Sequence, residues 1–333
     1  MDKTHIQWTS ATWNPLRGCS RVSEGCRNCY AEIISARFSG KGLPYEDLAE
    51  STPSGPRWTG EVRFVEKALP LPLRWKTPRR IFVNSMSDLF HEKVSDDWIA
   101  QIFAVMLMAP RHTFQVLTKR PERMTALLNK PGFEPHVESQ AYALSRKNAP
   151  DLLTYESIQK VGIRWPLPNV WLGVSVEDRE TYKQRVLYLA NTPAAVRFVS
   201  MEPLLADLGD LMLDGIYGDA YQWAIVGGES GPGARPFDVR WWRSAVKQCR
   251  AAGVPIFCKQ AGSMFVTSYY DDEYRMLYDD AGLDWPGPID WDITYGQPPL
   301  TSRVRIKLRD RKGGDWNEWP EDLRIREYPI RKA

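Results

Sequence analysis

Short runs of apolar and β-branched residues recur along the 333-residue chain, and each is closed by polar or glycine-rich positions. Such runs are typical of strands that are buried on both faces of a parallel sheet. We expect six of them, over residues 80–85, 113–117, 170–174, 196–200, 223–226 and 255–258. A further strand near residues 6–9 would make seven.

Helical patterns lie between most of these runs. Ser95 can cap a helix over residues 96–109, and Pro121 suits the first turn of a helix that ends near residue 128. Further helices are expected over residues 30–38, 178–189 and 239–252, the last of them stopped by Gly253. This alternation predicts an α/β protein of right-handed βαβ units with parallel strands, arranged as a partial TIM-like barrel.

Two stretches depart from the alternation. Residues 131–168 are polar and compatible with a helix, so they form an insertion, and residues 262–333 form an aromatic and charged tail. Within the tail, residues 302–308 alternate like an edge or amphipathic strand. We therefore expect a barrel domain over residues 1–261 and a C-terminal extension over residues 262–333 that packs on it.

Composition excludes some classes of protein. With 43% hydrophobic and 26% charged residues and no apolar stretch near 18 residues long, the chain is expected to be soluble and without a membrane role. The N-terminus lacks the apolar segment of a signal peptide, so the cytoplasm is the expected compartment. Its 44 basic and 41 acidic side chains give a net charge of +3, too small to indicate a nucleic-acid partner by itself.

Three of the five cysteines are clustered. An odd count in a chain of this kind argues against a disulfide framework and for metal binding or chemistry. Cys19, Cys26 and Cys29 lie within eleven residues, beside Gly18 and Gly25, which let the loop bend. Three converging thiolates imply a soft metal. The helix expected after the last cysteine would turn its positive end towards them.

Three interpretations of this loop are open. A [4Fe-4S] cluster held by three cysteines leaves one iron free for substrate or cofactor, whereas structural zinc calls for a fourth protein ligand. His91 follows a strand end and could be that ligand. The trio could also be unliganded thiols. Cys249 and Cys258 fall in a helical pattern and an apolar strand, where a free cysteine behaves as a small hydrophobic residue.

Polar side chains follow each strand-like run after the cysteine loop. The functional residues of parallel barrels lie at the C-terminal ends of the strands. The candidates, in chain order, are Ser85, Asp88, Lys119, Glu177, Glu202, Gly227, Gly228, Glu229 and Lys259. We expect them to share one mouth with the cysteines, although each alone could be a solvated loop residue. The glycine-rich segment 227–233 matches neither the GxGxxG nor the phosphate-loop spacing.

Several long motifs carry a resemblance to a known family. They span residues 18–32, 82–91, 117–121, 171–177, 200–204, 227–236, 259–260, 312–315 and 319–324. In these motifs the chain resembles, over nearly its whole length, the phage-associated three-cysteine-motif family of unknown function, which is related to the radical S-adenosylmethionine (SAM) superfamily. The resemblance implies a barrel of the radical SAM type, with a cluster on Cys19, Cys26 and Cys29 and SAM at its open iron.

The resemblance also implies roles for the strand-end residues. Cofactor binding is expected of Ser85, Asp88, Glu177, Gly227, Gly228 and Glu229, and catalytic roles are expected of Lys119, Glu202 and Lys259. Two features depart from the superfamily. The cysteines are spaced Cys-x6-Cys-x2-Cys rather than Cys-x3-Cys-x2-Cys, and Gly-Gly-Glu follows the sixth strand rather than the second.

The leading functional hypothesis is a radical SAM-like enzyme. It would generate a 5'-deoxyadenosyl radical and act on a nucleotide, a nucleic-acid base or a modified base, with a reductant protein supplying the electron. The main alternative is a non-catalytic nucleic-acid-binding or phage accessory protein with a structural metal. Its stacking and phosphate-binding face would comprise Arg235, Arg240, Trp241, Trp242 and Arg243. A third hypothesis is a zinc-dependent acid–base enzyme that uses the Glu and Lys side chains.

Overall fold

The computed structural model describes residues 4–148, 164–215, 218–268, 292–295 and 303–329. The fold is α/β and contains a seven-stranded sheet of order β1-β6-β7-β8-β9-β10-β12, consistent with a partial TIM-like barrel. The contacts divide the chain into two compact units, Met1–Ser175 with Leu187–Phe198, and Val176–Val186 with Val199–Ala333. No helix in the described part of the chain is long and apolar enough to cross a membrane.

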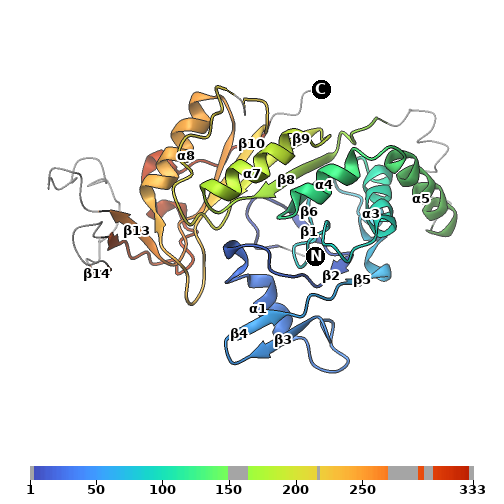
Figure 1. The fold of residues 1–333 in the computed structure, drawn as a ribbon, viewed down its shortest axis with the longest axis horizontal. Coiled ribbons are helices and arrows are strands. Elements are labelled where there is room, and N and C mark those ends of the chain that lie inside the picture. Colours follow the sequence, from blue (N-terminus) through green and yellow to red (C-terminus); the bar gives the residue numbers. More distant parts are fainter. Residues whose placement is uncertain (1–3, 149–163, 216–217, 269–291, 296–302, 330–333) are drawn as a thin grey trace. The chain divides into compact units, whose positions relative to one another are not determined.

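The first unit contains four neighbouring parallel strands (Figure 1). They are β1 (Ala11–Trp13), β6 (Arg80–Val83), β7 (Thr113–Thr118) and β8 (Val170–Ser175). Val83 pairs with Val116, which pairs with Leu172, and all three side chains are buried. The strands predicted to begin at residues 80, 113 and 170 are therefore confirmed.

The expected seventh strand before the cysteine loop exists, but its predicted position near residues 6–9 is wrong, because it lies at Ala11–Trp13. The backbone N–H of Thr9 donates to the carbonyl of Ile6 at 3.3 Å, which closes a turn. Trp8 is nonetheless buried in the core. The apolar pattern here reflects burial of a side chain rather than strand pairing.

Helices α3 (Asp96–Met108), α4 (Pro121–Leu128) and α5 (Phe133–Asn148) belong to the same unit, with the short α2 (Leu71–Arg74). The hydroxyl of Ser95 accepts from the backbone N–H of Trp98 at 3.2 Å, which confirms the predicted cap. Phe103 and Phe133 meet edge to face at 5.7 Å and join α3 to α5. The predicted insertion is thus helical in its first part, and residues 149–163 lie outside the described residues.

The N-terminal part of the chain also contains α1 (Tyr30–Arg37), and Figure 1 shows β3 (Ala49–Thr52) and β4 (Gly55–Trp58) beside it. β3 pairs with β4, and β2 (Leu16–Arg17) pairs with β5 (Arg63–Phe64), both in antiparallel fashion. Two 3-10 turns, η1 (Glu24–Cys26) and η2 (Glu66–Ala68), lie in the same stretch of sequence. The helix packs on β3 and β4.

The second unit contains β10 (Trp223–Gly227), β12 (Ile256–Gln260) and α8 (Val239–Ala251). β9 (Val196–Met201) and α7 (Arg179–Ala190) contribute residues to both units. β10 and β12 are parallel, with Val226 opposite Cys258. All of these elements lie where the sequence predicts them, within one or two residues.

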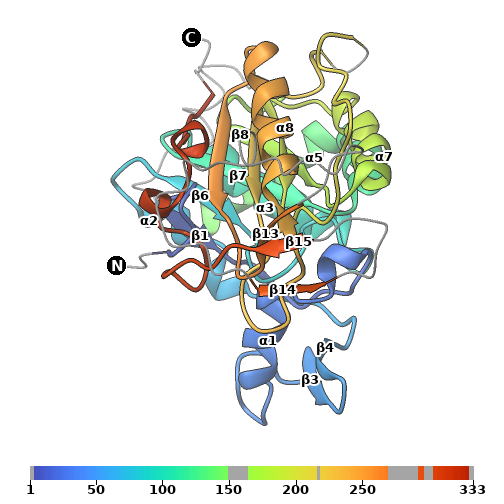
Figure 2. The ribbon, with the colours of Figure 1, turned by 90° about the vertical axis from the view of Figure 1, so that its left-hand side faces the viewer.

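A four-stranded sheet of order β11-β13-β15-β14 completes the second unit (Figure 2). Its strands are β11 (Phe237–Asp238), β13 (Phe265–Ser268), β14 (Asp292–Tyr295) and β15 (Arg303–Arg305). β15 pairs on both sides, so the expected strand near residues 302–308 exists but is not an edge. Two 3-10 turns follow, η3 (Trp316–Glu318) and η4 (Glu321–Leu323).

The tail returns to β12. The backbone N–H of Cys258 donates to the carbonyl of Ile325 at 2.8 Å, and Trp319 and Leu323 are buried. The expected domain boundary at residue 261 stays a prediction, because a division by contacts does not test which part folds alone.

Candidate functional site

The three-cysteine loop starts at a backbone position that requires glycine. Gly18 has φ +90°, and a Cβ there would lie 2.1 Å from the carbonyl oxygen of Glu61. A bridge between Gly18 and Ser87 places Cys19 beside the segment that follows β6. At the other end of the loop, Cys29 is the N-cap residue of α1.

Replacing Gly18 by alanine is expected to destabilise the protein more than the same change at Gly60. Gly60 also has a positive φ, +84°, but nothing lies within 4 Å of its missing Cβ. The strain of a positive φ is common to both variants, whereas the contact with Glu61 is found only at Gly18. That contact is expected to cost a further ~1–3 kcal/mol in urea unfolding. Equal losses at the two positions would contradict the prediction.

In the absence of a metal, burial favours the protonated form of these thiols, and a few neighbouring groups act against it. Burial and the charge of Asp88 raise the pKa of Cys19 to about 12, while Arg120 lowers it. Burial also raises the pKa of Cys29, and the backbone N–H groups of Ala31 and Glu32 act against this. Cys26 and Cys29 act electrostatically on Cys19, so the three thiols influence one another. A bound metal would displace their protons.

An ion pair between Arg21 and Glu32 links the cysteine loop to α1. The Nε of Arg21 donates to Glu32 Oε2 at 3.0 Å, and Glu32 is almost fully buried. The backbone N–H of Trp58 donates to Oε1 of the same carboxylate at 2.8 Å. The loop, the helix and strand β4 are therefore held by one carboxylate.

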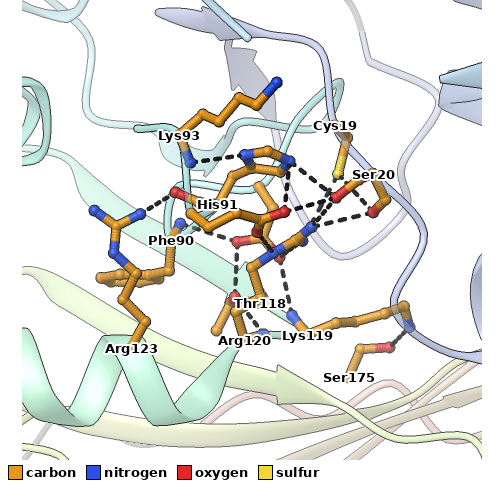
Figure 3. Close-up of polar contacts among 12 residues, drawn as sticks. Cys19, Ser20, Phe90, His91, Lys93, Thr118, Lys119, Arg120, Arg123 and Ser175 are labelled. Carbon is orange, nitrogen blue, oxygen red and sulfur yellow. Dashed lines mark hydrogen bonds and ion pairs between the residues drawn. The ribbon is translucent and has the colours of Figure 1, made fainter. Parts of the chain in front are cut away.

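Arg120 joins the end of β7 to the cysteine loop (Figure 3). Its Nη1 donates to Asp88 Oδ2 at 3.1 Å and lies 3.8 Å from Cys19 Sγ. Its Nε donates to Glu92 Oε2 at 2.8 Å. Its Nη2 donates to the hydroxyl of Ser20 at 2.7 Å and to the carbonyl of Ser20 at 3.2 Å. One guanidinium thus contacts both the cysteine loop and the segment that follows β6.

Asp88 accepts hydrogen bonds on both oxygens. Oδ1 accepts from Thr118 Oγ1 at 2.7 Å and from the backbone N–H of Phe90 at 3.0 Å. Oδ2 accepts from the backbone N–H of Lys119 at 3.1 Å, in addition to Arg120. Asp88 therefore connects the segment after β6 to the end of β7, and its predicted role in cofactor binding stays a prediction.

The other two predicted residues of this unit also lie at strand ends. Figure 3 shows the ammonium of Lys119 directed to the hydroxyl of Ser175, at the end of β8. The hydroxyl of Ser85 donates to Asn14 Oδ1 at 3.2 Å, and its carbonyl accepts from the hydroxyl of Tyr30 at 2.7 Å. The first unit therefore gathers the cysteine loop, Ser85, Asp88 and Lys119 on neighbouring strand ends.

His91 uses both ring nitrogens within the chain. Nδ1 accepts from the backbone N–H of Lys93 at 3.2 Å, and Nε2 lies 2.9 Å from the hydroxyl of Ser20. Burial, followed by the charge of Arg120, lowers the pKa of His91, so its ring is neutral near pH 7. Zinc ligation by His91 would require one of these hydrogen bonds to break.

No three His, Cys, Asp or Glu side chains in the described ranges are arranged to hold a single metal ion. A four-iron cluster makes a different demand, because each cysteine binds its own iron atom. The donor set, three thiols on one loop with amides and a guanidinium beside them, suits such a cluster chemically.

In the second unit, two of the predicted carboxylates form ion pairs with arginines. Nη1 of Arg185 lies 3.1 Å from both oxygens of Glu177, and the two side chains are 7% and 1% exposed. Arg235 donates from Nη2 to Glu229 Oε1 at 2.7 Å and from Nε to Oε2 at 3.1 Å. Direct cofactor binding by either carboxylate, which stays a prediction, would compete with its arginine.

The remaining predicted carboxylate pairs with a predicted lysine. Lys259 Nζ lies 2.9 Å from Glu202 Oε1, and both side chains are partly exposed. A Cβ on Gly227 would lie 2.7 Å from the same oxygen, and one on Gly228 would lie 2.6 Å from the carbonyl of Ala261. These glycines therefore make room for atoms of the protein itself.

The predicted nucleic-acid face does not form as expected. Trp242 is fully buried, and its indole N–H lies 3.0 Å from Cys258 Sγ. Arg240 pairs with Asp238, and Arg243 pairs with Asp322. Trp242 is a core residue because it lies on the face of α8 that packs against the aromatic side chains of Phe237, Phe265 and Trp319.

Sequence reasoning missed the arginine partners of the carboxylates. Arg185 and Arg235 lie eight and six residues after Glu177 and Glu229, so a search for local opposite charges would have found them. Arg120 lies beside the chosen Lys119, but nothing local indicates which of the two cations faces the cysteines.

The fold and the site define an α/β protein with a three-cysteine loop at the ends of parallel strands. The chain belongs to the family described as Protein of unknown function (DUF5131), which matches residues 3–320. No curated protein and no solved structure shows a significant match to it.

Proposed function

We propose that this protein is a cytoplasmic radical SAM-like enzyme in which Cys19, Cys26 and Cys29 hold a [4Fe-4S] cluster. The observation that carries the proposal is the three-cysteine loop itself. Cys29 caps α1, the Arg120 guanidinium lies 3.8 Å from Cys19 Sγ, and the loop is braced by Arg21 and Glu32. Backbone amides and a fixed cation are the groups that favour thiolates and tune iron–sulfur sites.

Cys19, Cys26 and Cys29 would hold the cluster, which, with a low-potential reductant protein, would supply the electron for cleavage of SAM to methionine and a 5'-deoxyadenosyl radical that abstracts a hydrogen atom from the substrate. The chain's own residues bind and orient the reactants and exclude water. Under this proposal Asp88, Glu177 and Glu229 contribute to cofactor binding, together with the arginines that they hold in place. Ser85, Gly227 and Gly228 provide backbone and hydroxyl groups at the strand ends.

The proposed substrate is a nucleotide, a nucleic-acid base or a modified base. This part rests on the resemblance to a phage-associated family and is an argument by analogy. Glu202 and Lys259 are the proposed catalytic pair, with Lys119 as a second cation. A carboxylate and an ammonium 2.9 Å apart can exchange a proton and can hydrogen-bond the polar edge of a base.

Anaerobic reconstitution tests the proposal. The protein is supplied with iron and sulfide and then with SAM and dithionite, and we expect a brown protein with about four irons per chain. Methionine and 5'-deoxyadenosine should form, and the same preparation of Cys26→Ala should form neither. A colourless protein with one zinc per chain would instead support a structural metal. A cluster that leaves SAM intact would point to electron transfer.

A further inference from the structure

Arg120 occupies an unusual place among the charged residues of the first unit. Its side chain is only 9% exposed, and it contacts Asp88, Glu92, Ser20 and Cys19 at once. We infer that Arg120 is a positioning residue of the three-cysteine centre, which fixes the Cys19 side of the loop and holds a permanent positive charge beside the Cys19 sulfur. This inference rests on the proposed iron–sulfur function, and it names the residue whose charge tunes the reduction potential of that centre.

The positioning role follows from the directions of the hydrogen bonds. Ser20 immediately follows Cys19, and Arg120 donates to both its carbonyl and its hydroxyl. Nη1, the nitrogen that lies beside Cys19 Sγ, also donates to Asp88 Oδ2 at 3.1 Å. A planar fork with five donors can make such contacts together, whereas an ammonium on a flexible stem cannot reproduce them.

The neighbouring cation is directed elsewhere. Lys119 directs its ammonium to Ser175 and donates its backbone N–H to Asp88 at 3.1 Å. Figure 3 shows the two side chains diverging, with Arg120 among the residues of the cysteine loop. The guanidinium of Arg120 lies 3.8 Å from Cys19 Sγ.

The electrostatic role has a defined sign. One-electron reduction adds a negative charge to a metal centre, and a cation nearby favours the more negative state. Arg120 should therefore raise the reduction potential of the centre, and the negative charge of Asp88 should lower it. Glu92 opposes Arg120 less, because its side chain is 62% exposed and solvent screens its charge. Removal of Arg120 and removal of the Asp88 charge should consequently act in opposite directions.

The test compares the reduction potentials of reconstituted full-length variants in a dye-mediated titration without SAM, together with iron content. Arg120→Met should shift the reduction equilibrium about tenfold towards the oxidised form, which is about 59 mV for one electron. Asp88→Asn should shift it in the opposite direction. Arg120→Lys should keep most of the wild-type potential, because the charge remains, but should lose iron to a chelator several-fold faster.

The matched control is Arg123→Met. Arg123 lies on α4 and donates to the carbonyls of His91 and Val94 rather than to the cysteine loop. A merely structural role of an arginine in this unit would lower iron content in both Met variants, but only the charge beside Cys19 would shift the potential of the remaining cluster. The potential of Arg123→Met should equal that of the wild type.

An unchanged potential in Arg120→Met, or an equal shift in Arg123→Met, would overturn the inference. If Arg120→Met takes up no cluster, the sign for Asp88→Asn decides instead, and an unchanged or lowered potential overturns it. A cluster that never cleaves SAM removes the proposed enzyme but not this inference, since the potential is measured without SAM. A wild-type protein that takes up no iron removes both.

Discussion

Replacing Cys26 by alanine is expected to abolish binding of the iron–sulfur cluster. Cys19, Cys26 and Cys29 are the thiols of one loop, and each would bind a separate iron, so loss of any one leaves an iron without its protein ligand. Alanine at Cys19 or Cys29 should have the same effect. Iron and sulfide per chain after anaerobic reconstitution, with the visible absorbance of the cluster, measure the result.

The two other cysteines provide matched controls for this prediction. Cys249 lies on α8 and Cys258 on β12, both are fully buried, and burial raises the pKa of each to about 12. Such thiols are inert side chains of the core. Cys249→Ala and Cys258→Ala should therefore retain the wild-type iron content. Unchanged iron in Cys26→Ala, with iron lost from Cys249→Ala, would show that the assignment of the ligands is wrong.

The elements that could be predicted from the sequence are those whose side chains are buried on a regular face. β8 is buried at all six positions and β10 at all five, so each reads as a continuous apolar run. Ser95 before Asp96 and Pro121 at the start of α4 marked helix starts correctly, because capping is a local interaction.

The elements that could not be predicted depend on contacts distant in sequence. Strand β3 is Ala-Glu-Ser-Thr, with only its first residue buried, so its pattern resembles a loop. β13 pairs with β11 on one side and with β15 on the other, and a single segment of sequence does not indicate its partners. For this reason residues 302–308 could be recognised as a strand but not as one with neighbours on both sides.

The residues of the candidate site also differ in whether the sequence alone could reveal them. The cysteines are visible in the sequence because they lie within eleven residues. Arg120 is separated from Ser20 by 100 residues, and only the pairing of β6 with β7 brings it towards the cysteine loop. The arginine partners of Glu177 and Glu229 lie only eight and six residues further along the chain, so they were within reach of a sequence search, unlike Arg120.

Replacing Arg185 by methionine is expected to destabilise the second unit strongly. Arg185 pairs with Glu177, which is 1% exposed and would lose the guanidinium charge that offsets its buried carboxylate. Removing one partner of a buried ion pair costs about 3–5 kcal/mol, because the remaining charge keeps its desolvation penalty without the attraction that offset it. The midpoint of urea unfolding, with the slope of the transition, measures this loss.

Two further variants distinguish loss of the ion pair from loss of side-chain packing as the cause of this destabilisation. Arg243→Met makes the same chemical change in the pair with Asp322, whose side chain is 52% exposed, and should cost no more than about 1 kcal/mol. The double variant Glu177→Gln with Arg185→Met also removes the buried negative charge of Glu177. It should be more stable than Arg185→Met alone, because a buried amide costs less than a buried carboxylate. If the double variant were as unstable as Arg185→Met, the contribution of Arg185 would be packing of its alkyl chain rather than neutralisation of Glu177.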